Sequence, residues 1–213
     1  MPRRLTLALL LLLILPAHAE RKPKPPLPAD QYPMHVEHAG VIIAAEPGDT
    51  KDARPDTRLD YFGHNLLPIR VIVTNNSTEP VSLDDARIHF IASDDTVLPA
   101  ATADDIERKF FTEKSAIGTK LPLDFPIPIT VGKKDFQKKI KQDDDDFGFK
   151  TTTIAPHTTV AGYLYYDTTD LPTPVLAKAY LQLRQARLTT SNRVLESFEI
   201  ALHPSTDATP AKH

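Results

Sequence analysis

Apolar and polar residues alternate along much of this chain, and the alternation predicts β-strands. It is clearest in the segment 66–74, where every second residue from Leu67 to Val73 is apolar and Arg70 falls on the opposite face. A period of two is typical of a strand with one buried face and one exposed face. Alternating or β-branched-rich patterns predict further strands in these segments: 35–45, 87–93, 160–167, 175–188 and 194–203.

Turn-forming residues separate the predicted strands. Asn, Ser and Pro residues suit a tight turn at 75–80, and the polar stretch 189–193 places the last two strands in a hairpin. About seven short strands in a chain of this size are typical of an antiparallel all-β sandwich.

One stretch between the strands, 102–111, has a helical pattern instead. Thr102 and Asp105 have the spacing of a capping box, which marks the start of a helix. Ile106 and Phe110 follow at i and i+4, so they fall on one helical face. We therefore expect one short helix packed against the strands.

The segment 112–150 interrupts the strand pattern and is predicted to be an insertion. Its prolines exclude a central strand and favour an edge strand or an extended arm: Pro122, Pro126 and Pro128. Further along, Phe136 and Ile140 predict a short amphipathic helix, which should end before Asp143 because acidic residues are unfavourable at a helix C-terminus. We expect the insertion to be the least stable and most function-specific part of the protein, because loops more often carry function than the framework does.

Both ends of the chain differ in composition from the rest. A positively charged start, an apolar run and the small residues at Ala17–Ala19 predict a signal peptide over 1–19. The apolar run is shorter than the ~20 residues of a membrane-spanning helix, so we expect a mature chain with no transmembrane segment, exported to the periplasm or the extracellular space. The proline-rich stretch 20–33 predicts a linker, and 205–213 predicts a disordered tail.

Cysteine content and charge narrow the classes of function. The chain has no cysteine, which excludes disulfides, a thiol nucleophile and a thiolate metal site. Its formal net charge is −3 and becomes more negative if Arg3 and Arg4 leave with the signal peptide. Such a chain has no electrostatic reason to bind nucleic acid or anionic lipid.

Two segments carry a resemblance to a family. The residues concerned are Val71, Val73, Asn75, Ser77, Pro80, Val81 and Leu83 in the first segment, and Pro156, Val160, Gly162, Leu164 and Tyr166 in the second. Together they resemble the exported immunoglobulin-like domains of the DUF4352 (telokin-like) kind and related uncharacterised bacterial secreted proteins. His157 stands where that family usually has glycine. The resemblance implies an immunoglobulin-like antiparallel β-sandwich, here a single domain over 34–204, and it brings no catalytic residue.

Two motifs suggest chemistry at first sight. His35 and His38 are three residues apart, and on a strand such residues point to opposite faces, so we expect no metal there. The acidic run 143–146 begins like a calcium loop, but Ile154 stands where that loop needs glutamate, so we expect a solvated loop. A weak calcium site outside that pattern remains an alternative. We expect no catalytic residue and no cofactor.

Two groups of residues are candidates for a partner surface. Tyr163 and Tyr165 share one sheet face, and Tyr180 from another strand is a candidate to join them. If exposed, this aromatic face would suit a protein or glycan partner. We favour the alternative that the segment 117–131 covers it, because large exposed apolar patches are uncommon on monomers. The second group consists of lysines of the insertion: Lys133, Lys134, Lys138, Lys139 and Lys141. They either neutralise the acidic run in solution or form a charged partner site whose binding weakens with salt.

These observations favour a non-enzymatic exported module that binds a partner or has a structural role. The expected partner is a protein or glycan of the cell envelope or the extracellular space. One alternative is a periplasmic assembly chaperone that acts through a sheet edge, although the second domain usual in pilus chaperones has no room here. The other alternative is a hydrolase, for which the sequence has no recognisable nucleophile motif.

Overall fold

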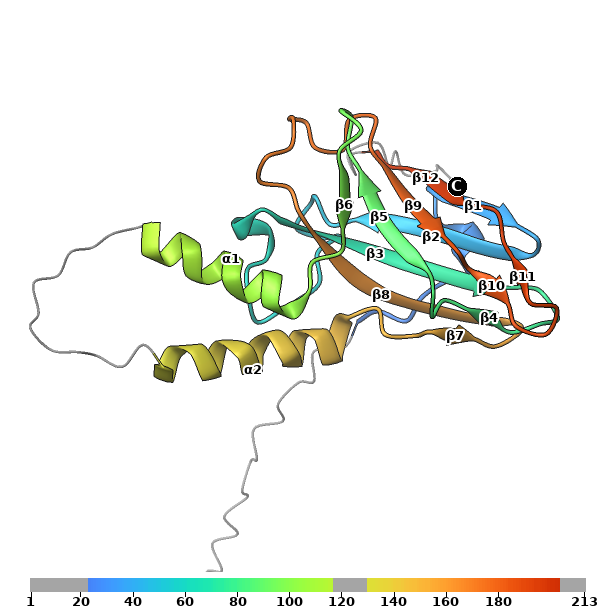
Figure 1. The fold of residues 1–213 in the computed structure, drawn as a ribbon, viewed down its shortest axis with the longest axis horizontal. Helices are drawn as coiled ribbons and strands as arrows, with labels where there is room; N and C mark the ends of the chain where they lie inside the picture. The colour runs from blue at the N-terminus through green and yellow to red at the C-terminus, as the bar shows by residue number, and fades with distance from the viewer. Residues whose placement is uncertain (1–22, 117–129, 204–213) are drawn as a thin grey trace, which may run out of the picture.

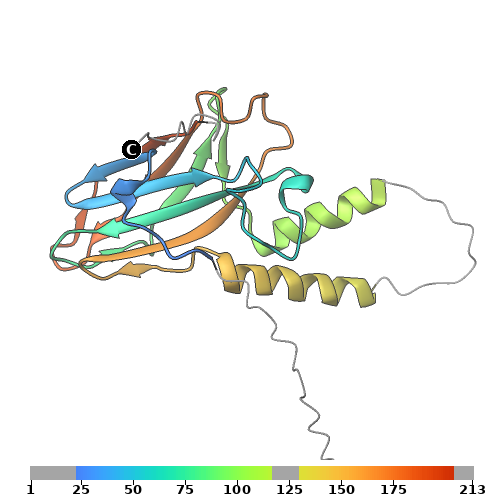
Figure 2. The same cartoon turned by 180° about the vertical axis from the view of Figure 1, so that it is seen from behind.

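Three four-stranded antiparallel sheets and two α-helices make up the part of the chain that the computed structural model describes, residues 23–116 and 130–203. The predicted signal peptide and the predicted C-terminal tail lie outside the described residues. In the first sheet the strand order is β1-β2-β3-β8 (Figures 1 and 2). Its strands are β1 His35–His38, β2 Val41–Pro47, β3 Leu66–Asn75 and β8 Thr158–Asp167.

The chain passes directly between the other two sheets. β4 of one sheet leads into β5 of the other, and β9 leads back into β10 of the first. Their orders are β12-β9-β5-β6 and β11-β10-β4-β7. The strands of the second sheet are β5 Arg87–Ile91, β6 Val97–Pro99, β9 Tyr180–Arg184 and β12 Phe198–Ala201. Those of the third are β4 Val81–Ser82, β7 Thr153–Ile154, β10 Arg187–Leu188 and β11 Arg193–Val194. The predicted C-terminal hairpin is confirmed, because β9 pairs with β12 and β10 with β11.

One apolar core lies between the sheets, as an all-β sandwich requires. It joins Ile69 and Val71 of β3 to Phe90 of β5, Leu181 of β9 and Phe198 of β12, none of which is exposed. Burying a large apolar side chain of this kind stabilises the fold by roughly 1.5–3 kcal/mol. The alternation predicted from the sequence is thus confirmed for the core-facing residues of these strands.

β3 differs from its prediction, because all ten of its residues are buried and not only the core-facing half. Arg70 and Thr74, which the alternation assigns to an exposed face, are 6% and 4% exposed. The sequence pattern of one strand shows which residues share a face, but it does not show what covers that face.

Part of that outer face is covered by the N-terminal segment, which was predicted to be a linker. The described residues 23–33 lie across the first sheet (Figure 2). Ala29 is fully buried there against Ile42 and Ile72, and its backbone N–H donates to Thr74 Oγ1 at 2.8 Å. This part of the proline-rich stretch therefore belongs to the fold, whose boundary lies before residue 34.

The first predicted strand, 35–45, is a hairpin of β1 and β2. Ala39 and Gly40 form its two-residue turn, with φ of 53° and 77°, and His38 pairs with Val41. Two positive φ values are typical of a type I′ turn, the tight turn that matches the twist of paired strands. The sequence prediction of one continuous strand was wrong because alanine seldom adopts a positive φ.

The two helices are longer than predicted and lie side by side, extending beyond one end of the sheets (Figures 1 and 2). α1 spans Ala103–Ala116 and begins with the predicted capping box: Thr102 Oγ1 accepts from the Asp105 N–H at 3.2 Å, and Asp105 Oδ2 accepts from the Thr102 N–H at 3.0 Å. The Thr102 hydroxyl also donates to Asp105 Oδ2, at 2.7 Å, and this bond together with the one from the Thr102 N–H lowers the pKa of Asp105 below its usual value. α2 spans Thr130–Phe147, so the prediction that it ends before Asp143 was wrong. The proline-containing arm falls within 117–129, outside the described residues.

The outer edge of β8 is met by the chain segments that lead into α1 and out of α2. Ala101 donates its N–H to the Tyr165 carbonyl at 2.7 Å, and Phe149 donates to the Tyr163 carbonyl at 3.2 Å. Gly148 also forms a parallel bridge with Tyr163. The segments that flank the two helices are therefore joined to the first sheet through their backbone.

His157 has a φ of 56°, in the left-handed region that glycine adopts without cost. Its N–H donates to the Asn75 carbonyl at 2.6 Å, which fixes this turn, while its side chain is exposed. We expect His157→Gly to change the free energy of unfolding by less than about 0.5 kcal/mol, and His157→Val to lower it by about 1–2 kcal/mol, because a β-branched residue is strained at positive φ. Urea denaturation of both variants tests this, and equal effects would show that the turn relaxes.

Candidate partner-binding surface

α2 has one apolar side that docks on α1 and on the first sheet. Ile140 and Phe147 are each 4% exposed, and Phe136 packs against the same cluster. The Phe136 ring lies 4.8 Å from the ring of Phe110 in α1, measured between centroids. Aromatic pairs at this separation contribute about 0.5–1.5 kcal/mol beyond their buried area. The predicted amphipathic helix is thus present, and its apolar side holds the two helices together.

Tyr163 and Tyr165 lie beneath these helices. They are 9% and 7% exposed, and Tyr61 stacks on Tyr165 with ring centroids 4.3 Å apart. Burial raises the pKa of Tyr61, Tyr163 and Tyr165 above the usual value for tyrosine. The two tyrosines share a sheet face as predicted, but they are not exposed to a partner. The segment 117–131, which was the predicted cover, lies almost entirely outside the described residues.

Tyr180 is not brought together with the other two tyrosines. It begins β9 in the second sheet, opposite Ala201 and Ile91, and is partly exposed. The structure therefore forms no aromatic surface from Tyr163, Tyr165 and Tyr180.

A buried carboxylate, that of Asp143, anchors the last turns of α2 to the loop before β3. Asp143 is fully buried. Its oxygens accept from the backbone N–H groups of Arg58 and Leu59, at 2.9 and 3.3 Å, and from the hydroxyl of Tyr61 at 3.2 Å. The Arg58 guanidinium donates to Asp143 at 2.9 Å and pairs with Asp146 at 2.7 Å. Hydrogen bonds to Asp146 and Asp143 raise the pKa of Arg58.

The acidic run is consequently part of a helix and not a solvated loop. Asp144 and Asp145 face Lys150, at 3.1 and 2.5 Å, and the hydrogen bond to Lys150 lowers the pKa of Asp145. These ion pairs stabilise the C-terminal end of α2. The helix therefore continues through acidic residues, which are otherwise unfavourable at a helix C-terminus. Within residues 23–116 and 130–203, no three His, Cys, Asp or Glu side chains come together as a metal site would require.

The two histidines of β1 have different surroundings. His35 Nδ1 lies 2.6 Å from the Tyr32 carbonyl oxygen. His38 packs its ring on Phe198, with centroids 4.8 Å apart, and its Nδ1 is 3.7 Å from Glu196 Oε2. The structure does not bring these two side chains to one site.

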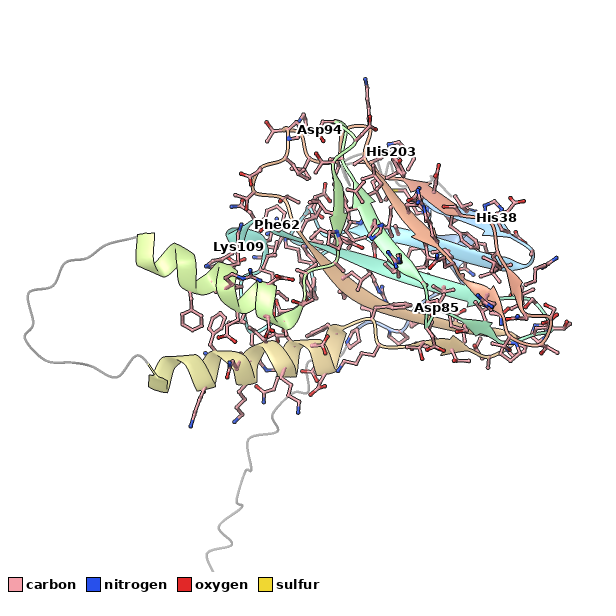
Figure 3. All side chains as sticks on the ribbon, in the orientation of Figure 1. His38, Phe62, Asp85, Asp94, Lys109 and His203 are labelled. Atoms are coloured by element: carbon pink, nitrogen blue, oxygen red, sulfur yellow. The ribbon has the colours of Figure 1, made fainter. Side chains whose placement is uncertain are left out.

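Over residues 134–141, the side of α2 opposite its docked face is basic. Lys134, Lys138 and Lys141 recur at i, i+4 and i+7, which places them on one stripe of a helix with 3.6 residues per turn. All three are exposed, and none makes a hydrogen bond or ion pair with another residue of the described chain. Lys139, also exposed, pairs with Asp135 at 3.8 Å. Lys133 belongs to α2, but its side chain lies outside the described part. We call Lys134, Lys138 and Lys141 the lysine stripe; Figure 3 shows nitrogen-tipped side chains extending from α2 on the side away from α1.

The roles of Arg58, Tyr61 and Asp143 were missed from the sequence. One signal was available for Asp143, because it follows Phe136 and Ile140 at the i, i+4, i+7 spacing of a single helical face. No local pattern connects that face to Arg58 or Tyr61, which lie more than eighty residues earlier in the chain.

No helix in the described ranges is long and apolar enough to cross a membrane. No protein family, curated protein or solved structure matches this chain.

Proposed function

We propose that this protein is a non-enzymatic exported binding module of the cell envelope or extracellular space, and that its lysine stripe binds an acidic partner. The observation that carries the proposal is the exposure of Lys134, Lys138 and Lys141 on the side of α2 that faces away from the rest of the fold.

Three features support a partner site over a merely solvated helix face. The chain is acidic overall, yet five lysines fall between residues 133 and 141. At a rise of about 1.5 Å per residue, the stripe holds three positive charges within roughly 10 Å. The helix that carries them is fixed at its base by Asp143, so a partner meets a surface that is already ordered.

We also propose an immunoglobulin-like topology for the sandwich. The antiparallel sheets and the resemblance described above support it. The chaperone alternative is less favoured, since the backbone of Ala101 and Phe149 already meets the ten-residue outer strand β8. The outer strands β1, β6 and β12 have only three or four residues each. Such short edges give a client strand little backbone to pair with.

Binding to two immobilised acidic probes tests the lysine stripe: poly-L-glutamate for an acidic protein and heparin for an acidic glycan. We expect the triple variant Lys134→Gln, Lys138→Gln, Lys141→Gln to bind the preferred probe about tenfold more weakly at low salt, a loss of roughly 1.4 kcal/mol. Wild-type binding should weaken as salt rises past ~0.1 M, where the Debye length falls to about 10 Å.

The matched control removes three exposed positive charges elsewhere: Lys51→Gln, Lys178→Gln, Arg193→Gln. An equal loss in both triple variants would show that only net charge matters. An unchanged affinity in the stripe variant would rule out this surface.

A further inference from the structure

The outer face of the second sheet is open. In Figure 1 it faces the viewer and neither α1 nor α2 lies over it, whereas residues 23–33 cross the outer face of the first sheet (Figure 2). Since Phe90, Leu181 and Leu183 point into the core, the alternate residues of β5 and β9 point outward. The strand pairing arranges these outward residues in rows that cross the sheet.

One of these rows holds two arginines side by side. Arg87 of β5 and Arg184 of β9 are directly opposite each other in the register. Their Cβ atoms are therefore about 5 Å apart, and like charges in this arrangement destabilise a sheet. Both side chains are exposed, and neither makes a hydrogen bond or an ion pair with another residue of the described chain. Nothing in the described fold compensates this repulsion, which points to a ligand that carries negative charge.

Two carboxylates lie near the arginine pair, and neither neutralises it. Glu199, in the next row, accepts from Gln182 Nε2 at 2.8 Å. Asp85, in the exposed turn before β5 (Figure 3), forms no ion pair with either arginine. Arg87 and Arg184 therefore present two positive charges to whatever approaches this face.

Two guanidinium groups match a doubly charged anion better than a carboxylate. A carboxylate has one negative charge and two oxygens, which a single guanidinium satisfies with two parallel donors. A phosphate monoester has a charge of about −1.5 to −2 at pH 7 and three acceptor oxygens. Such a group can accept from Arg87 and Arg184 together.

The next two rows of this face are polar and aromatic. His89 lies opposite Gln182, and Tyr180 lies opposite Ile91 in the row beyond. Rows two residues apart along a strand are separated by about 7 Å. Imidazole and amide groups both donate and accept hydrogen bonds, and a partly exposed tyrosine offers an apolar ring with a hydroxyl. These rows suit a molecule that is rich in hydroxyl groups and extends along the strands.

We propose that the outer face of the second sheet binds a phosphorylated glycan, with the phosphate on Arg87 and Arg184. The sugar attached to that phosphate lies over His89 and Gln182, toward Tyr180. On an open face a free phosphate ion would contact the arginines alone, whereas a sugar phosphate also contacts the neighbouring row. This site is separate from the lysine stripe, and it stands if the stripe binds nothing.

Proton–nitrogen NMR of the arginine Nε–Hε groups observes the site directly. Titration with glucose 6-phosphate should shift the signals of Arg87 and Arg184, with a Kd near ~1 mM. Inorganic phosphate should bind at least about fivefold more weakly because it lacks the sugar, and glucose and acetate should shift neither signal. Each titration is made at a constant ionic strength of about 0.1 M, so that screening does not differ between probes.

Arg184→Gln should weaken glucose 6-phosphate at least about tenfold, because it removes one of the two charge-assisted contacts. Since it also removes the like-charge contact with Arg87, it should leave the free energy of unfolding equal or higher. Arg193→Gln makes the same change at an exposed arginine of β11 and should leave binding unchanged. The triple variant of the lysine stripe should also leave binding unchanged, so the two sites are tested separately.

Three results would each overturn the proposal. They are no shift of either signal at about 10 mM glucose 6-phosphate, equal losses in Arg184→Gln and Arg193→Gln, and inorganic phosphate that binds as tightly as the sugar phosphate. A phosphoserine peptide that binds more tightly than glucose 6-phosphate would overturn it as well, because the partner would then be a phosphoprotein.

Discussion

Replacing Asp143 with asparagine is expected to lower the free energy of unfolding by about 3 kcal/mol, the range typical when one partner of a buried ion pair is removed. The carboxylate accepts from two backbone N–H groups, the Tyr61 hydroxyl and the Arg58 guanidinium. Asparagine has the same shape but no charge, and its NH₂ group would face donors. Urea denaturation followed by circular dichroism measures the loss, and hydrogen exchange should show it first in α2.

Asp145→Asn is the control for Asp143→Asn, because it makes the same chemical change two residues along the same helix. The Asp145 side chain is 54% exposed and pairs only with Lys150 in the described chain. Exposed ion pairs contribute about 0–1 kcal/mol, so we expect a loss below ~0.5 kcal/mol. If the two variants lose equal stability, Asp143 is not the anchor of α2.

Gly162→Ala is expected to lower the free energy of unfolding by about 2 kcal/mol, within the range for overpacking. A Cβ at this position in β8 would stand 2.5 Å from the Phe149 backbone nitrogen and 2.7 Å from the Gly148 carbonyl carbon. Backbone atoms cannot rotate away as a side chain can. The segment that leaves α2 would have to shift, and its hydrogen bond from Phe149 to Tyr163 would be lost.

Gly63→Ala is the matched glycine substitution for this test. Its Cβ would meet the exposed carboxylate of Asp60, which can swing aside at the cost of one bond to the Gly63 N–H. We expect a loss below about 1 kcal/mol, as for other changes at the surface. Thermal or urea denaturation of both variants compares them, and a harmless Gly162→Ala would mean that the chain after α2 is not held against β8.

The sequence predicted the sandwich well where a single strand carries enough information. In β8, the core face formed by Val160, Leu164 and Tyr166 and the opposite face with Tyr163 and Tyr165 follow directly from the alternation. Side-chain direction depends only on strand geometry, so it is readable without any knowledge of neighbours.

Other features depended on contacts between distant segments and were not predictable in this way. Nothing in the alternation of β3 shows that residues 23–33 and the helices cover its second face. Acidic residues near a helix end are unfavourable in isolation, yet α2 continues because Arg58 and Lys150 pair with them. The prediction that the insertion is the least stable segment remains to be tested by hydrogen exchange and limited proteolysis.

Because of the backbone contacts at β8, we expect α1, α2 and the segments that flank them to contribute to solubility. β8 has ten residues and is an edge strand of its sheet. Unpaired backbone N–H and C=O groups at such an edge would pair readily with a strand of another molecule. Ala101 and Phe149, which lead into α1 and out of α2, already occupy the carbonyls of Tyr165 and Tyr163. Excising residues 101–149 to obtain a minimal sandwich would uncover the edge of β8, and we expect the shortened protein to be prone to aggregation even with its apolar core complete.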